Sequence, residues 1–242
     1  SHYELTEDLA LPSFNHVILY VPAEEVWLEW TSSSFPPNYI GASNADHPVL
    51  LVTKQGGQLA RTPAFTAADN LQKSKTYIQL QADGKATLRD EVEIAGALHD
   101  IYRAVAKQLS DEEMRKWFLE NSNLPMSTIE ALTINVSEKE PVAQLAYQLQ
   151  IPRFASRAGR RLFAPINLVN ASTSIPPAVE ERNFPAHITT GRMEVDTVII
   201  KLPKGMQVES MPEEGFSIES DFGTYLASMK QQGQQVIYCR KL

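Results

Sequence analysis

The feature that most constrains the fold is a succession of short runs of alternating apolar and polar residues, which begins at Thr76. Turn residues separate the runs, and the pair Asp83-Gly84 favours a tight hairpin in which both central residues have positive φ. Short strands at near-regular spacing are typical of β-sandwiches. We therefore expect a mainly β fold, an antiparallel β-sandwich. The expected strands are 77–81, 86–94, 129–137, 143–151, 162–169, 193–202, 207–210, 216–220, 224–229 and 234–240.

A pair of helices interrupts this pattern. Apolar residues recur at helical spacing near 97–109, and Ser110 followed by Glu113 forms a capping box that begins a second helix over 111–121. Asn121 and the residues before Pro125 end that helix. We expect this helical pair to be an insertion that covers a sheet edge or packs on one face of the sandwich.

The N-terminal part has a different organisation. Residues 14–21 are apolar on both alternating faces and predict a strand, which a four-residue loop connects to a second strand over 26–31. A short strand follows over 49–52, and residues 66–75 are small and polar, as in a linker. The predicted division is an N-terminal β part at 1–65, a linker at 66–75 and a β-sandwich domain at 76–242.

The first hairpin brings a histidine and a carboxylate together. If Val21 lies opposite Val26, then Glu29 lies opposite Ile18, and His16 is a diagonal neighbour of Glu29 on the same face. A carboxylate in this place fixes the tautomer of an imidazole and supports its charged form, as in the histidine and acid of a nucleophile-His-acid triad. A histidine on an apolar strand is also commonly a satisfied core residue, and the pairing alone leaves that alternative open.

Several short strings resemble the transglutaminase-like (papain-like) core of large multidomain bacterial proteins, particularly those of Bacteroidetes. The strings are Phe14-Asn15-His16-Val17-Ile18, Trp27-Leu28-Glu29-Trp30-Thr31, Pro37-Asn38-Tyr39-Ile40-Gly41 and Leu50-Leu51-Val52. The resemblance implies that residues 1–65 are the antiparallel β remnant of such a core. It also implies that His16 is the catalytic histidine and that Glu29 stands where the triad aspartate is usual.

The C-terminal part is similar to the β-sandwich domain of unknown function that follows this core. The strings that carry this resemblance are Arg182-Asn183-Phe184-Pro185, Leu202-Pro203-Lys204-Gly205-Met206-Gln207-Val208-Glu209 and Met211-Pro212. The family resemblance further implies export to the periplasm or cell envelope.

The single cysteine limits what these residues can do alone. In the family, the nucleophilic cysteine lies at a helix N-terminus some tens of residues before the histidine strand, whereas the fifteen residues before His16 contain none. Cys239 falls in the last predicted strand, where we expect a small buried hydrophobic residue. We expect the chain to be the C-terminal fragment of a transglutaminase-like enzyme of peptides or proteins, inactive alone. Its partner is then the upstream part of the same polypeptide, which carries the nucleophile.

Composition excludes several other classes. The formal net charge of −7 does not suit a phosphate backbone, and no run of eighteen apolar residues predicts a membrane span. One cysteine excludes an intrachain disulfide and a cysteine zinc cage, and we expect no cofactor. Asp46 and His47 are metal-ligand candidates with His16 or Glu29, but their spacing matches no standard site, and we expect no metal.

A second function class remains beside the enzyme. The chain can instead be a non-catalytic β-sandwich module, with a binding or structural role at the bacterial cell envelope. A cluster of arginines before a predicted strand suits a carboxylate or a sugar acid, although a solvated turn is the better explanation of it. The tryptophans are expected on core faces rather than in a glycan groove. The arginines are Arg153, Arg157, Arg160 and Arg161, and the tryptophans are Trp27, Trp30 and Trp117.

Overall fold

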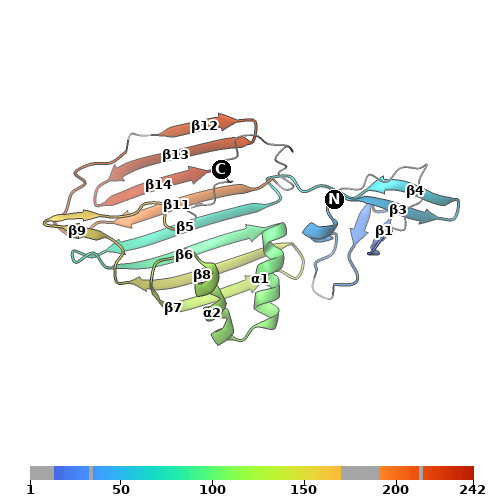
Figure 1. Cartoon of the computed structure of the whole chain (residues 1–242), viewed down its shortest axis with the longest axis horizontal. Coiled ribbons are helices and arrows are strands. Elements are labelled where there is room, and N and C mark those ends of the chain that lie inside the picture. The colour runs from blue at the N-terminus through green and yellow to red at the C-terminus, as the bar shows by residue number, and fades with distance from the viewer. Residues whose placement is uncertain (1–13, 33–34, 170–190, 213–214) are drawn as a thin grey trace, which may run out of the picture.

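The computed structural model describes residues 14–32, 35–169, 191–212 and 215–242. Its main element is an eight-stranded sheet, and a smaller group of short strands lies beyond one end of that sheet (Figure 1). Two helices pack against the large sheet. The predicted mainly β fold class is confirmed.

The smaller group consists of two hairpins and a 3-10 turn. In the first hairpin Val21 lies opposite Val26, so the predicted pairing register is confirmed, although both strands are shorter than expected. The elements are β1 (Leu19–Val21), β2 (Val26–Leu28), η1 (Ala42–Asn44), β3 (Pro48–Thr53) and β4 (Gly56–Arg61). The pairs β1–β2 and β3–β4 are both antiparallel.

The large sheet draws its strands from the rest of the chain. In spatial order they are β12 (Phe216–Ser220), β13 (Gly223–Gln232), β14 (Gln235–Lys241), β11 (Met193–Lys201), β5 (Leu71–Leu80), β6 (Ala86–Ala95), β8 (Val142–Ile151) and β7 (Thr128–Val136). The helices are α1 (Ala97–Gln108) and α2 (Asp111–Asn121), and a small hairpin consists of β9 (Ser156–Ala158) and β10 (Arg161–Phe163).

The strands form one mixed sheet, whereas the sequence predicted two packed antiparallel sheets. Every neighbouring pair is antiparallel except β5 and β11, which run parallel in the middle of the sheet. Helices and irregular segments cover the buried face, with side chains such as Trp117, Ile166 and Val208 packed on the core. A strand with one buried face has a period of two whatever covers it, so the alternation alone could not reveal this arrangement.

The segments at 162–169 and 207–210 also differ from the prediction. Only Arg161–Phe163 of the first segment is a strand, and the second is irregular. Leu168 and Val208 nevertheless pack against the core. The apolar residues of these segments therefore pack on the buried face of the sheet, although the segments are not strands of that sheet.

The buried face of the large sheet is mostly apolar, and a row of polar residues crosses it. Ile78, Leu88 and Ile200 represent its apolar part, with exposed fractions of at most 2%. The polar row includes Asp90, whose carboxylate accepts hydrogen bonds from the Thr76 hydroxyl at 2.9 Å and the Tyr147 hydroxyl at 2.8 Å. Burial raises the pKa of Asp90, although these two hydrogen bonds favour the ionised form.

The same polar row crosses from β5 to β11 and β14. Ser74 Oγ donates to Asp196 Oδ1 at 2.8 Å, and Arg240 Nε donates to Asp196 Oδ2 at 2.6 Å. Because β5 begins at Leu71, half of the expected linker at 66–75 belongs to this sheet. Within that half, Ser74 faces a partner in the core, whereas Lys73 and Lys75 are exposed.

The helical pair is confirmed with nearly the predicted bounds. The Ser110 hydroxyl accepts from the Glu113 backbone N–H, and the Glu113 carboxylate accepts from the Ser110 backbone N–H at 2.9 Å, so the capping box is present. The helix α1 contacts β6, β7 and β8, and so packs on the face of the sheet close to its β7 edge.

The turn between β5 and β6 differs from the predicted one. Gly84 has a φ of 91°, but among the described residues Asp83 is not one of those with positive φ. The Gln81 N–H donates to the Lys85 carbonyl at 2.8 Å, which closes a longer loop than a two-residue turn. Gly84 is required for a second reason, since a Cβ atom there would lie 2.7 Å from the Ala155 carbonyl oxygen.

We predict that Gly84→Ala destabilises the protein by more than the about 1–2 kcal/mol that a left-handed backbone costs an alanine. The excess arises because the carbonyl of Ala155 must move. Gly233→Ala is the matched control, since Gly233 has a φ of 58° but no atom within 4 Å of the new Cβ. Urea unfolding of both variants measures the difference, and equal losses of stability would contradict the prediction.

Candidate functional site

Glu29 is the central residue of the candidate site. It directly follows β2, and its side chain is only 3% exposed. The backbone N–H of Thr31 donates to Glu29 Oε1 at 2.9 Å, and the Thr31 hydroxyl donates to the same oxygen at 2.5 Å. Asn44 Nδ2 donates to Glu29 Oε2 at 2.9 Å. Three donors therefore hold the carboxylate in place from two directions.

His16 completes this arrangement. Its Nε2 atom lies 2.5 Å from Glu29 Oε2, and its side chain is 38% exposed. The predicted contact between the two side chains is therefore present, and the imidazole also has an open side. The catalytic role of His16 and Glu29 stays a prediction.

Opposing effects set the ionisation of Glu29. Burial disfavours the carboxylate, but the hydrogen bonds from Thr31 and His16 outweigh it and hold the pKa of Glu29 below its ordinary value. Glu29 is therefore an anion at neutral pH. An anion at this distance stabilises the positive charge that an imidazole acquires when it accepts a proton.

Sequence reasoning missed Thr31 and Asn44. Thr31 had a local signal, because a threonine two residues after a carboxylate can donate to it with both its backbone and its hydroxyl. Asn44 had none. It reaches Glu29 from η1, fifteen residues away, and the same amide nitrogen also donates to the Ile40 carbonyl at 2.8 Å.

The loop that carries Asn44 is connected to the large sheet through α1. The backbone N–H of Ala42 lies 3.4 Å from Asp100 Oδ2, and the Tyr39 hydroxyl donates to the Gly96 carbonyl at 3.2 Å. The Tyr39 ring stacks on Phe65 and meets the ring of His99 edge-on. The geometry around Glu29 therefore depends on contacts with the large sheet's own helix.

Cys239 lies elsewhere and is not buried as predicted. It is on β14, opposite Thr197 of β11 and Ser228 of β13, and its side chain is exposed. The buried neighbours Tyr238 and Arg240 alternate with it, so Cys239 faces outward. Cys239 belongs to the large sheet, whereas His16 precedes β1, which lies in the smaller group of strands (Figure 1).

The remaining candidates do not join the site. Arg61 Nε contacts Asp46 Oδ1 at 2.5 Å, and His47 Nδ1 lies 2.6 Å from the Ala45 carbonyl. Among the described residues, no group of three His, Cys, Asp or Glu side chains could hold a metal ion.

Trp30 was predicted on a core face, but it is 75% exposed. No helix in the described ranges is long and apolar enough to cross a membrane.

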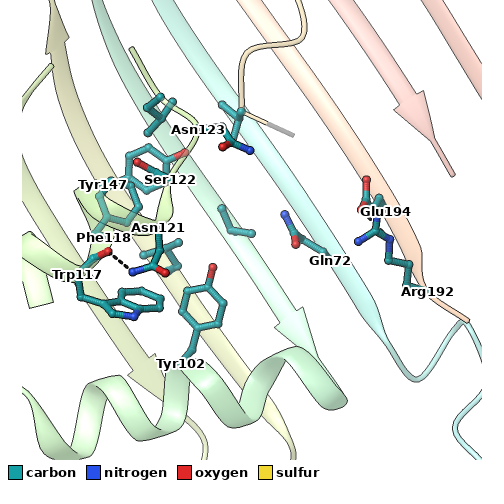
Figure 2. A pocket seen from close by; sticks show the side chains of 14 residues that line it. Gln72, Tyr102, Trp117, Phe118, Asn121, Ser122, Asn123, Tyr147, Arg192 and Glu194 are labelled. Carbon is teal, nitrogen blue, oxygen red and sulfur yellow. Dashed lines mark hydrogen bonds and ion pairs between the residues drawn. The ribbon is translucent and has the colours of Figure 1, made fainter. Parts of the chain in front are cut away.

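A separate pocket of about 310 Å³ lies between the helices and the large sheet (Figure 2). Tyr102 of α1 and Trp117 of α2 meet edge to face at one side, and Arg192 and Glu194 lie at the other. Glu194 Oε1 and Arg192 Nε are 3.1 Å apart. The Tyr102 hydroxyl points into the pocket and forms no hydrogen bond within the described ranges. Aromatic walls and polar groups together are typical of small-ligand sites.

Comparison with known families matches only the C-terminal part of the chain. A family described as "Domain of Unknown Function with solved-structure structure (DUF3858)" matches residues 159–242, which include β10 to β14. Searches of curated proteins and of solved structures found no match. The predicted C-terminal domain of unknown function is thus supported, and the resemblance to a transglutaminase-like core stays a prediction. The string Arg182-Asn183-Phe184-Pro185 lies outside the described residues.

We predict that Thr31→Val raises the pKa of Glu29 toward its ordinary value of 4.5, because the hydroxyl donor is lost. A lowered pKa stabilises the fold above that ordinary value, and this contribution is lost as the pH falls through the lowered pKa. The variant loses it at a higher pH. Carbon-13 NMR titration of the Glu29 carboxyl measures the shift directly.

Thr53→Val is the matched control for this titration. The Thr53 hydroxyl donates to the Gly56 carbonyl in the same group of short strands but does not contact Glu29. An unchanged Glu29 titration in Thr31→Val, or an equal change in Thr53→Val, would contradict the role given to the Thr31 hydroxyl.

Proposed function

We propose that His16 and Glu29 are the acid-base half of a transglutaminase-like cysteine enzyme that acts on amide bonds of peptides or proteins. The observation that carries the proposal is the 2.5 Å contact between a half-exposed imidazole and a buried carboxylate that is itself held by three further donors. A merely structural histidine needs neither the open side nor so strongly fixed a partner. The resemblance of the strings around His16 and Glu29 supports the same assignment.

In this proposal each nitrogen of His16 has its own role. Because Nε2 faces Glu29, Nδ1 is the nitrogen available to a cysteine thiol. His16 Nδ1 accepts the thiol proton, and the thiolate attacks the amide carbonyl carbon to form a tetrahedral intermediate. The imidazolium then returns the proton to the leaving amine as the carbon–nitrogen bond breaks. Water or a second amine attacks the resulting thioester, and this step regenerates the thiol.

The nucleophile in this proposal comes from a segment of polypeptide beyond these 242 residues. Cys239 is the one cysteine in the sequence, and it faces outward from the large sheet. The proposed enzyme is bacterial and acts in the periplasm or cell envelope, in keeping with the family resemblance. The 242 residues supply the histidine, its orienting carboxylate and an accessory β domain.

We predict that these 242 residues alone give no hydrolysis or amine transfer with a protein acyl donor and a fluorescent primary amine. In a polypeptide that also carries the nucleophilic cysteine, His16→Ala lowers kcat by about a hundredfold or more, because general acid-base catalysis is lost. The assay is incorporation of the amine into the protein donor. His47→Ala is the control, since the His47 side chain contacts the Ala45 carbonyl and not His16 or Glu29.

Two results would refute the proposal. Turnover by the 242 residues that disappears on His16→Ala would show that the nucleophile is within this chain. Full activity of the His16→Ala variant in the longer polypeptide would show that His16 is not the base. Glu29→Gln keeps the size of the side chain but removes its charge. A normal rate in that variant would show that His16 does not need the Glu29 carboxylate for catalysis.

A second candidate function is that of a non-catalytic module which binds a small polar ligand. The observation that favours it is the pocket of Figure 2, with the Tyr102 hydroxyl directed into a space that Trp117, Arg192 and Glu194 also line. Titration with monosaccharides, followed through the indole N–H signal of Trp117 by NMR, tests it. A saturable shift that Tyr102→Phe weakens supports this function, and no shift with any sugar argues against it.

A further inference from the structure

A cavity of about 770 Å³ lies over apolar residues of the large sheet, and neither His16 nor Glu29 lines it. Its floor consists of Leu80, Ile200, Met229 and Val236, which come from four neighbouring strands. Each of these side chains is at most 7% exposed, so the base of the cavity is sheltered from bulk water. The base of the cavity is therefore apolar and buried, and its exposed rim is mostly polar.

Two further segments form the walls. Residues 160–166, which include β10, contribute Phe163 and Ile166, and residues 202–212 contribute Met206 and Met211. Methionine side chains are flexible and polarizable, and they adapt to ligands of varied shape. Protein interiors otherwise contain few voids larger than a water molecule, because an empty apolar cavity loses its packing contacts. A space of this size suits a small-molecule ligand.

The charge at the mouth indicates the chemistry of that ligand. Arg161 is paired with Glu209 through two hydrogen bonds, of 2.8 Å and 2.6 Å. Arg160 also lines the cavity, but it makes no hydrogen bond or ion pair within the part of the chain that the structure describes. Among the described residues, the mouth therefore carries one guanidinium that no carboxylate pairs with. Arg160 and Arg161 belong to the arginine cluster noted in the sequence, and such a cluster suits a carboxylate ligand.

We propose that this cavity binds a fatty acid, with the alkyl chain against the sheet and the carboxylate at Arg160. The apolar floor and the methionines accept the chain, and the guanidinium supplies a charge-assisted hydrogen bond to the head group. All lining residues except Leu80 lie within 159–242. Fatty-acid binding is thus a role for the matched domain that is independent of the His16 and Glu29 chemistry.

The test uses the 242-residue chain and dodecanoate below its micelle concentration, followed by titration calorimetry. We expect saturable binding, and a higher thermal unfolding midpoint in the presence of dodecanoate because it binds the folded state. Butanoate, which has the same head group but eight methylene groups fewer, binds at least about a hundredfold more weakly. Dodecyltrimethylammonium, which has the same chain but a positive head group, binds at least about tenfold more weakly.

Three variants locate the site. Arg160→Gln weakens dodecanoate binding about tenfold, through loss of the charged hydrogen bond. Glu209→Gln strengthens it several-fold, because the change removes a negative charge at the mouth and releases Arg161. Arg157→Gln is the matched control, since Arg157 donates to the Gly159 carbonyl and does not line the cavity, and its affinity stays unchanged.

Three outcomes would overturn the proposal. Equal affinity for dodecanoate and the cationic amphiphile would mean non-specific surfactant binding. No effect of Arg160→Gln would place the carboxylate elsewhere. No binding of any probe to the folded protein would mean that the cavity is not a fatty-acid site. Val208→Trp gives a further check, because a bulky wall residue must abolish binding while circular dichroism shows a folded protein.

Discussion

The parallel pairing of β5 with β11 is the constraint on which the rest of the structure depends. It joins residues 71–80 to residues 193–201, and so unites the strands on either side of the helical pair with those of the C-terminal region. The buried contact between Ser74 and Asp196 crosses this boundary, and Arg240 extends it to β14. A buried carboxylate without such partners would be costly, so the polar row also favours this register over its alternatives.

The region that the family match covers does not form a separate sheet in this chain. The match covers residues 159–242, yet its strand β11 has β5 as a neighbour, and the sheet continues through β6 and β8 to β7. Without β5, the backbone of β11 would be an unpaired edge. The matched region is therefore part of a larger sheet in this chain, and its buried apolar face is completed by Leu80 from outside the match.

The candidate acid-base pair depends on the same sheet indirectly, through contacts with α1. Glu29 is held by Asn44, and the turn that carries Asn44 lies against Asp100 of α1. Tyr39 anchors the same segment to the Gly96 carbonyl at the start of α1. The short strands are too few to bury a core of their own. Their packing on α1 therefore contributes to fixing the carboxylate.

Local features of the fold could be predicted from the sequence, and its long-range features could not. The register of the first hairpin followed from its four-residue loop, and the start of α2 followed from Ser110 and Glu113, because loop length and capping act between near neighbours. The parallel β5–β11 pair and the contact of Asn44 with Glu29 join distant segments, and no periodicity marks them. Cys239 shows the same limit, since which face of β14 is covered depends on the whole sheet.

In the proposed enzyme, Glu29 stands where the resemblance implies an aspartate, and the contacts of Glu29 show how a glutamate can be held in such a place. A glutamate has one more rotatable bond than an aspartate, so fixing its carboxylate costs more conformational entropy. Here two donors from Thr31 hold one oxygen, and Asn44 and His16 contact the other. Hydrogen bonds to a charged group are stronger than those between neutral groups, and they offset that cost. The longer side chain is thus compatible with a fixed imidazole, provided that Thr31 and Asn44 are retained.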